Sequence, residues 1–265
     1  MPNYDSSKYM MAAEEAARCL LCHEAPCSRA CPAGIDPARF IQALRFRNFK
    51  GGAKNIRENN VFGGVCAKLC EASRYCQSAC IRKKLDRPVD IPGLQAFLVD
   101  YEWENNMKIL KPLPSNGKSA AILGAGIAAV TCGAQLALAG FKVKIYALGE
   151  VAGKALLKEA AQGRIDKGII EKELELVKEL GVEFIPHVNL ETVADREEFR
   201  ESGFDALVIT ARSAVNTVQS MSGKTPVFFS GDLIIGPDDY VYSVKKGKLT
   251  AGQIIKLVGP KEEAV

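Results

Sequence analysis

Eight of the nine cysteines stand in two groups of four within the first 80 residues, and thiolates at such a density are ligands for soft metals. The first group is Cys19, Cys22, Cys27 and Cys31, and the second is Cys66, Cys70, Cys76 and Cys80. The first group reads C-x2-C-x4-C-x3-C and is followed at once by Pro32, so that it ends as the ferredoxin run C-x2-C-x2-C-x3-C-P ends. This spacing predicts two iron–sulfur clusters that carry electrons.

Two other kinds of site use cysteine, and both stay open as alternatives. Structural zinc usually takes pairs of cysteines with a longer gap between the pairs, often with histidine, and here His23 is the one histidine near the cysteines. Disulfides or unligated buried thiols are the second alternative. Disulfides need an oxidising compartment, whereas the N-terminal residues form no apolar signal segment and include acidic side chains. We therefore expect reduced, metal-bound cysteines and a cytoplasmic location.

Length and composition bound the other classes of function. The chain has 265 residues, 48% of them hydrophobic and 25% charged, which suits one large or two modest globular domains. No apolar run approaches the length of a membrane span. The net charge of +4 is spread along the chain without a nucleic-acid-binding motif. We expect no nucleic-acid partner, and we recognise no catalytic triad, nucleophile or general base.

The elements that must position the cysteines are helical. An alanine- and glutamate-rich helix is expected over 9–21, and a second helix begins with Asp36 as its cap and Pro37 in its first turn. Its buried face would carry Phe40, Ile41, Leu44 and Phe49, and a further helix is expected over 52–59. Residues 1–109 are thus predicted to form a helical iron–sulfur domain, followed by a linker over 110–119 that holds two prolines and a glycine.

The pattern changes after the linker. A strand over 120–123 runs into a G-x-G-x-x-A turn formed by Gly124, Gly126 and Ala129, which is the dinucleotide-binding fingerprint in its alanine variant. A helix over 130–139 and a strand over 141–147 complete the unit. Further elements follow in alternation: a helix over 169–180, strands over 182–186, 204–210 and 227–230, and a helix over 239–257. Alternating strands and helices predict a parallel sheet, so 120–265 is expected to be a Rossmann-like α/β domain.

With both parts in view, the chain resembles the family of glutamate synthase small subunits and the N-terminal half of dihydropyrimidine dehydrogenases. The resemblance lies in the segments AARCLLCHEAPCSRACPAGIDPARFI, VCAKLCEASRYCQSAC, IPGLQAF, LGAGIAA and FFSGDLIIGP. It implies a two-part α+β chain: a helical domain with two [4Fe-4S] clusters, then an FAD-type α/β domain. In the family, an NADPH-binding domain is inserted into the second part.

The resemblance also implies a crossed set of ligands. One cluster would be held by Cys19, Cys22, Cys27 and Cys80, and the other by Cys31, Cys70, Cys76 and Gln95. Cys66 would then be a bystander. Without the resemblance, Gln95 would be taken for an ordinary exposed polar residue of a helix. Cys132, on the helix after the glycine turn, is expected to be a small buried hydrophobic residue.

Two departures from the family affect the expected cofactors. Only 211–226 joins the segments between which the family inserts its NADPH domain, so we expect no hydride uptake from NAD(P)H by this chain alone. The FAD contacts are also altered: Ala147 replaces an acidic residue (with Glu150 close by), Gly153-Lys154 replaces a Gly-Gly pair, and Arg212 replaces a turn glycine. Gly124, Gly126, Ala129, Gly231 and Asp232 are retained. FAD binding and an empty docking scaffold both remain open.

The resemblance implies an electron-transfer subunit of a multi-subunit oxidoreductase. Its two clusters would relay single electrons to or from the redox centre of a partner subunit, with or without FAD. The partner would be a flavin, iron–sulfur or molybdenum/tungsten enzyme, on which the substrate chemistry takes place. The alternatives are a stand-alone FAD-dependent reductase of a small acceptor and a non-redox structural or docking subunit.

Overall fold

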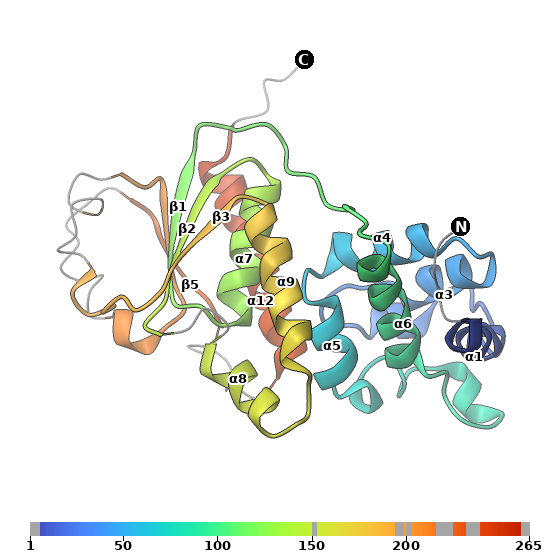
Figure 1. Ribbon diagram of the computed structural model, residues 1–265. Helices are drawn as coiled ribbons and strands as arrows, with labels where there is room; N and C mark the ends of the chain where they lie inside the picture. The colour runs from blue at the N-terminus through green and yellow to red at the C-terminus, as the bar shows by residue number, and fades with distance from the viewer. Residues whose placement is uncertain are drawn as a thin grey trace, which may run out of the picture. The chain divides into compact units, whose positions relative to one another are not determined.

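A computed structural model describes residues 6–149, 153–193, 199, 203–215, 225–231 and 239–260 (Figure 1). The chain divides into two compact units, Met1–Leu110 and Lys111–Val265. The first unit is helical and contains eight of the nine cysteines. The second is built around a sheet.

Short helices and turns make up the first unit. They are α1 (Ser6–Ala17), α2 (Pro26–Arg29), α3 (Pro37–Arg45), α4 (Phe49–Asn59), α5 (Gly63–Leu69) and α6 (Ile91–Glu104), with 3₁₀ turns η1 (Ala72–Arg74) and η2 (Ile81–Lys84). Their core is formed by fully buried side chains such as Phe40, Ile41, Ile56 and Leu98. The helices are too short to be stable alone in water, so their packing must stabilise them.

Side-chain caps decide where these helices begin. Asp36 accepts a hydrogen bond from the backbone N–H of Arg39, with Pro37 in the first turn of α3 as the sequence predicts. The same arrangement recurs at α6, which Asp90 caps. The assignment of Phe49 to the helix that Asp36 starts is wrong. Helix α3 ends at Arg45 because Arg47 adopts a left-handed backbone (φ 56°), and Phe49 is the first residue of α4, where it is still buried.

A buried ion pair joins α4 to α6. The Nε of Arg57 lies 2.6 Å from Oε2 of Glu102, and the side chains are 0% and 3% exposed. Arg57 also donates a hydrogen bond through Nη1 to the carbonyl of Val61, at 2.7 Å. One guanidinium thus connects two helices to the loop that leads into α5.

The second unit is built on a five-stranded sheet in the order β3-β2-β1-β4-β5. The strands are β1 (Ser119–Leu123), β2 (Lys142–Tyr146), β3 (Val182–Ile185), β4 (Ala206–Ile209) and β5 (Val227–Phe229), and every pairing is parallel. The helices are α7 (Ile127–Leu138), α8 (Gly153–Ala161), α9 (Lys167–Glu179) and α12 (Tyr240–Val258), with the 3₁₀ turn η4 (Arg212–Ala214). The predicted parallel-sheet α/β part is confirmed.

Both faces of the sheet are covered, as parallel sheets require. Helices α7, α9 and α12 lie on one face (Figure 1). Helix α12 packs closely on α7, where a Cβ on Gly247 would lie 2.5 Å from the carbonyl oxygen of Ala128. The opposite face carries a second core that includes Leu123, Tyr146 and Ile209.

The link between β4 and β5 is short. The two strands are direct neighbours in register, with Val208 opposite Phe228, and residues 210–226 connect them. This is the point at which the family's inserted domain was expected to be missing. Among the described helices, none combines the length and the apolar character needed to cross a membrane.

Candidate metal centres

The structure regroups the cysteines across the two sequence groups. Cys80 lies with Cys19, Cys22 and Cys27, and these four, called here the Cys80 group, line one small cavity. The Cys19 thiol interacts electrostatically with the thiols of Cys22 and Cys80, and the Cys27 thiol interacts with those of Cys19 and Cys80. Three short elements bring them together: the turn after α1, helix α2, and the residue that precedes η2.

A second set of thiols, called here the Cys76 group, consists of Cys31, Cys70 and Cys76. The Cys76 thiol interacts electrostatically with Cys70, Cys31 and, more weakly, Cys27. Cys31 follows α2, and Cys70 is the C-terminal cap of α5. The chain therefore brings Cys31 to the partners of the second sequence group and Cys80 to those of the first.

Burial makes these thiols poor acids in the absence of a metal. Burial, with a smaller contribution from neighbouring thiols, raises the pKa of Cys76 to about 12 and that of Cys27 to about 11. The pKa of Cys19 is raised for the same reasons. A bound metal reverses this tendency because it stabilises the thiolate directly. Metal binding at these sites would therefore also stabilise the folded state of the first unit.

Hydrogen-bond donors already point at the sulfur atoms. The backbone N–H of Leu21 donates to Cys19, that of Ser28 to Cys27 and that of Gln77 to Cys76, and each bond lowers the pKa of its thiol. N–H donors of this kind surround the sulfurs of iron–sulfur clusters and set their potentials. These backbone N–H groups therefore stabilise the thiolate forms of Cys19, Cys27 and Cys76.

The Cys80 group offers four thiols, which are the donors that structural zinc and iron–sulfur clusters take. Within the described residues, no three His, Cys, Asp or Glu side chains come close enough together to hold one metal ion. In a four-iron cluster each thiolate binds a different iron atom, so the thiols must stand further apart. None of the nine cysteines forms a disulfide in the structure, and all nine lie within the described residues.

Gln95 is not the exposed polar residue that its type alone suggests. It is 7% exposed on α6, and its Nε2 donates a 2.6 Å hydrogen bond to the carbonyl of Gly63, the first residue of α5. This bond commits the amide nitrogen and leaves the side-chain oxygen as the remaining acceptor. The hydrogen bond joins α6 to the start of α5 in the interior of the first unit.

Cys66 has a hydrogen-bonding partner of its own. Its sulfur accepts a 3.1 Å hydrogen bond from Nδ2 of Asn60, which is fully buried. The side-chain oxygen of Asn60 accepts from the N–H of Phe62. Asn60 therefore ties α5 to the loop before it. Cys132, on α7, is fully buried, as expected of a small hydrophobic residue, and burial raises its pKa to about 12.

The retained nucleotide-type residues gather at the carboxyl edge of the sheet. Gly124 follows β1 with φ 117°, and a Cβ there would collide with the Thr210 hydroxyl, which donates to the carbonyl of Leu123. Gly126 is the N-terminal cap of α7 and offers no side-chain hydrogen bond. Gly231 (φ 74°) follows β5. The turns after three neighbouring strands thus meet beside the start of α7, where phosphates bind in dinucleotide folds.

The other residues of the expected FAD site are placed as follows. Ala129 is fully buried on α7, and Ala147 is buried at the end of β2, where it offers no carboxylate to a ribose. Arg212 begins η4. Asp232 and Glu150 lie outside the described residues, as does the side chain of Lys154, whereas Gly153 is the first residue of α8.

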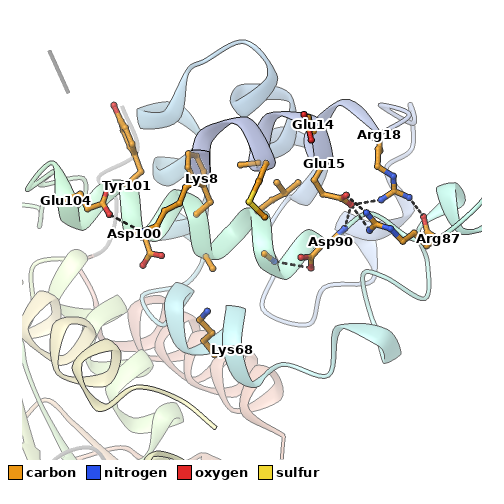
Figure 2. Close-up of a pocket in the computed structure, with 16 residues that line it drawn as sticks. Lys8, Glu14, Glu15, Arg18, Lys68, Arg87, Asp90, Asp100, Tyr101 and Glu104 are labelled. Atoms are coloured by element: carbon orange, nitrogen blue, oxygen red, sulfur yellow. Dashed lines mark hydrogen bonds and ion pairs between the residues drawn. The ribbon is translucent and has the colours of Figure 1, made fainter. Parts of the chain in front are cut away.

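A groove in the first unit had no sequence signal. It has a volume of about 640 Å³ and is lined mainly by α1 and α6, with Lys68 of α5 (Figure 2). At one end Glu15 receives hydrogen bonds from Arg18, Arg87 and the backbone N–H of Asp90. Its lining residues lie far apart in the sequence, so only the folded structure brings them together.

Comparison with known proteins agrees with this architecture. Residues 3–107 match the family described as dihydropyrimidine dehydrogenase domain II, 4Fe-4S cluster. The NAD-dependent dihydropyrimidine dehydrogenase subunit PreT of Escherichia coli K12 is 36% identical over 230 residues, which are 86% of this chain and 54% of that protein. PreT of Salmonella typhimurium is 42% identical over 173 residues, 65% of this chain and 42% of that protein.

A more distant relative is the NADPH-Fe(3+) oxidoreductase subunit beta of Geobacter sulfurreducens, 28% identical over 247 residues, 92% of this chain and 36% of that protein. The chain thus spans about half the length, or less, of the curated relatives it matches. The N-terminal unit of the chain is therefore homologous to the family described as dihydropyrimidine dehydrogenase domain II, 4Fe-4S cluster.

Proposed function

We propose that this protein is the electron-transfer subunit of a multi-subunit oxidoreductase and holds two [4Fe-4S] clusters in its N-terminal unit. The Cys80 group would hold one cluster. The Cys76 group together with Gln95 would hold the other. Substrate chemistry would take place on a partner subunit, since the chain offers two electron relays and no recognised catalytic triad.

The regrouping of the cysteines is the observation that carries this proposal. Sequence order alone would assign four neighbouring cysteines to each site, yet Cys80 lies with Cys19 and Cys27, and Cys31 lies with Cys76. A crossed arrangement is what the ferredoxin-type C-x3-C-P ending leads to, because its last cysteine serves the neighbouring cluster. It leaves Cys66 outside both ligand sets and requires one further ligand, for which the buried Gln95 is available.

The chain's own residues prepare both sites for negative charge. When bound, a [4Fe-4S] cluster accepts and releases one electron at a time. The N–H groups of Leu21, Ser28 and Gln77 stabilise the thiolates, and burial keeps water away from Cys76. The Gly63 carbonyl holds the amide of Gln95, and a neutral oxygen ligand there would leave one fewer negative charge than a fourth thiolate.

The α/β unit is proposed to retain a phosphate cradle. Gly124, Gly126 and Gly231 supply close backbone approach at the start of α7, which suits the pyrophosphate of FAD. The buried Ala147 removes one ribose contact, so flavin would be held more weakly than in the family. Incubation with FAD followed by acid release and fluorescence measures the retained flavin. Full iron content without flavin would favour a docking scaffold.

The electron-transfer proposal is tested by an anaerobic redox titration of the reconstituted full chain, monitored by electron paramagnetic resonance. We expect about two electrons per chain and two paramagnetic centres that form and disappear reversibly. NADH alone should leave both centres oxidised, since the described residues form one dinucleotide-type sheet. A matched control is Cys132→Ser, which changes a buried cysteine of the other unit and should leave both signals intact. Centres that cannot be reduced, or rapid reduction by NADH alone, would contradict the proposal.

A further inference from the structure

Apolar side chains surround the Cys80 group at the protein surface. Leu20 and Ile81 line the same small cavity as its four cysteines. Both are exposed, by 43% and 38%, and the adjacent Leu21 and Leu85 are exposed by 38% and 67%. The proposed cluster in the Cys80 group therefore has exposed apolar side chains beside it.

The backbone at Leu21 is strained in a way that maintains this surface. Its φ of 50° places a bulky residue in the left-handed region, which L-residues other than glycine seldom occupy. In this conformation its N–H donates to the Cys19 sulfur while its side chain stays exposed. Strain of this kind persists where the surroundings require it, commonly at functional sites.

A basic segment adjoins the apolar side chains. Residues 82–87 read RKKLDR, four cations and one carboxylate. That carboxylate, Asp86, is paired with both Arg18 and Arg82, so it cannot offset the remaining charge. Lys83 and Lys84 are exposed and lie between Ile81 and Leu85 in the sequence of the turn. The surface therefore presents an apolar centre with a positive edge.

This basic segment is attached rigidly to the rest of the unit. Arg87 donates to Glu15 of α1 at 2.7 Å, and the backbone N–H of Asp90 donates to the same carboxylate (Figure 2). Arg82 donates to the carbonyl of Arg18, directly before Cys19. The lysines are thus held close to the cysteines rather than on a freely moving loop.

We propose that this surface, formed by Leu20, Leu21, Ile81, Lys83, Lys84 and Leu85 and called here the leucine–lysine surface, docks an acidic one-electron carrier protein. The proposal rests on the proposed function, because it assumes a cluster in the Cys80 group. In the step, the chain gives up one electron and the carrier gains it, and no bond is made or broken.

Charge and apolar contact have separate roles at such a surface. The positive edge raises the association rate of a negatively charged protein and makes that rate depend on salt. The apolar centre excludes water at the shortest path to the cluster. Electron-transfer encounters use small, weak interfaces, so a few exposed leucines and two lysines are enough.

The experiment uses two haem proteins as probes: cytochrome b5, which is acidic, and cytochrome c, which is basic. The full chain, reconstituted and reduced without oxygen, is mixed with each oxidised probe by stopped flow over a range of ionic strengths. Haem iron goes from Fe(III) to Fe(II) as the chain loses one electron. We expect the rate with cytochrome b5 to fall with salt, and Lys83→Glu/Lys84→Glu to reduce it about tenfold at low salt. The rate with cytochrome c should rise in that variant.

A matched variant and a binding measurement complete the test. Lys142→Glu/Lys256→Glu changes the net charge equally at two exposed lysines of the other unit and should leave the cytochrome b5 rate nearly unchanged. Titration calorimetry with oxidised cytochrome b5 should show weaker binding only for the Lys83/Lys84 variant. Equal effects of the two variants, or rates that ignore salt, would overturn the docking surface. Preparations lacking reducible iron and sulfide would instead overturn the proposed function, which separates the two failures.

Discussion

Removing the buried guanidinium of Arg57 should destabilise the first unit far more than removing an exposed cation from the same helix. Arg57→Met leaves the Glu102 carboxylate, whose side chain is 3% exposed, without its ion-pair partner. Breaking a buried pair in this way costs about 3–5 kcal/mol. If the free energy of unfolding falls by about 2 kcal/mol per M of urea, the urea concentration at the unfolding midpoint should drop by about 1.5–2.5 M. The Val61 carbonyl loses its donor as well.

Lys54→Met is the matched control on α4. Lys54 pairs with Glu58 at 3.5 Å, but the two side chains are 58% and 51% exposed. An exposed i,i+4 pair contributes about 0.3–0.5 kcal/mol, so this midpoint should move by only about 0.2 M. The double variant Arg57→Met/Glu102→Leu removes the stranded carboxylate and should recover most of the loss.

The assay follows fluorescence of Trp103, the one tryptophan of the chain, which reports on the first unit. Arg57 lies 5.6 Å from the centre of its ring, so midpoints rather than intensities are compared. Burial raises the pKa of Glu102 against the pull of Arg57. In Arg57→Met that pKa should rise further, so the destabilisation should grow as the pH rises. A midpoint shift no larger than that of Lys54→Met, or one that shrinks with rising pH, would refute the reasoning.

Three further predictions concern other parts of the chain. Gly247→Ala should destabilise the α/β unit by about 1–3 kcal/mol, because the new Cβ would lie 2.5 Å from a carbonyl oxygen of α7. Gly252→Ala on the same helix meets open space and should stabilise the unit by about 1 kcal/mol. Thermal unfolding followed by circular dichroism compares the two variants. Burial opposes ionisation of Asp205, but hydrogen bonds from Ser119 and Lys118 outweigh it and hold its pKa below the usual range. Its carboxylate therefore stabilises the fold above the unfolded pKa, and the advantage of the wild type over Asp205→Asn should disappear as the pH falls through the folded pKa; an advantage that persists in acid would contradict this. Gln95→Cys should keep the second cluster and lower its potential in a redox titration, since a thiolate adds negative charge, and an unchanged potential would leave Gln95 a structural residue.

Several elements of the fold were predictable because their signals are local. The Asp36-Pro37 cap, the apolar strands and the glycine turn each depend on a few neighbouring residues, and each forms where the pattern indicates. Phe49 was assigned to the wrong helix because an interruption at Arg47, a residue with no special preference for turns, ends α3 early. Helix boundaries of this kind depend on packing rather than on residue type.

The C-x3-C-P ending indicates that Cys31 serves the neighbouring cluster, but the spacing does not show which cysteines Cys80 joins. Nearness in sequence pairs Cys80 with Cys76, whereas the fold places it with Cys19, more than sixty positions away, and only the family resemblance predicted the exchange. The Arg57–Glu102 pair is equally non-local, at a separation of 45 positions. Neither charge is distinguishable in sequence from the solvated charges around it. Long-range polar contacts need the folded structure because no local pattern encodes them.

Iron and acid-labile sulfide counts on anaerobic preparations test the central claim most directly. The wild type should hold about eight iron atoms and eight sulfides per chain. Cys80→Ala should lose about half of both, because Cys80 serves one cluster, and Cys66→Ala should keep the full amount. Zinc without sulfide in the wild type, full iron in Cys80→Ala, or loss of a cluster in Cys66→Ala would contradict two clusters held by crossed sets of cysteines.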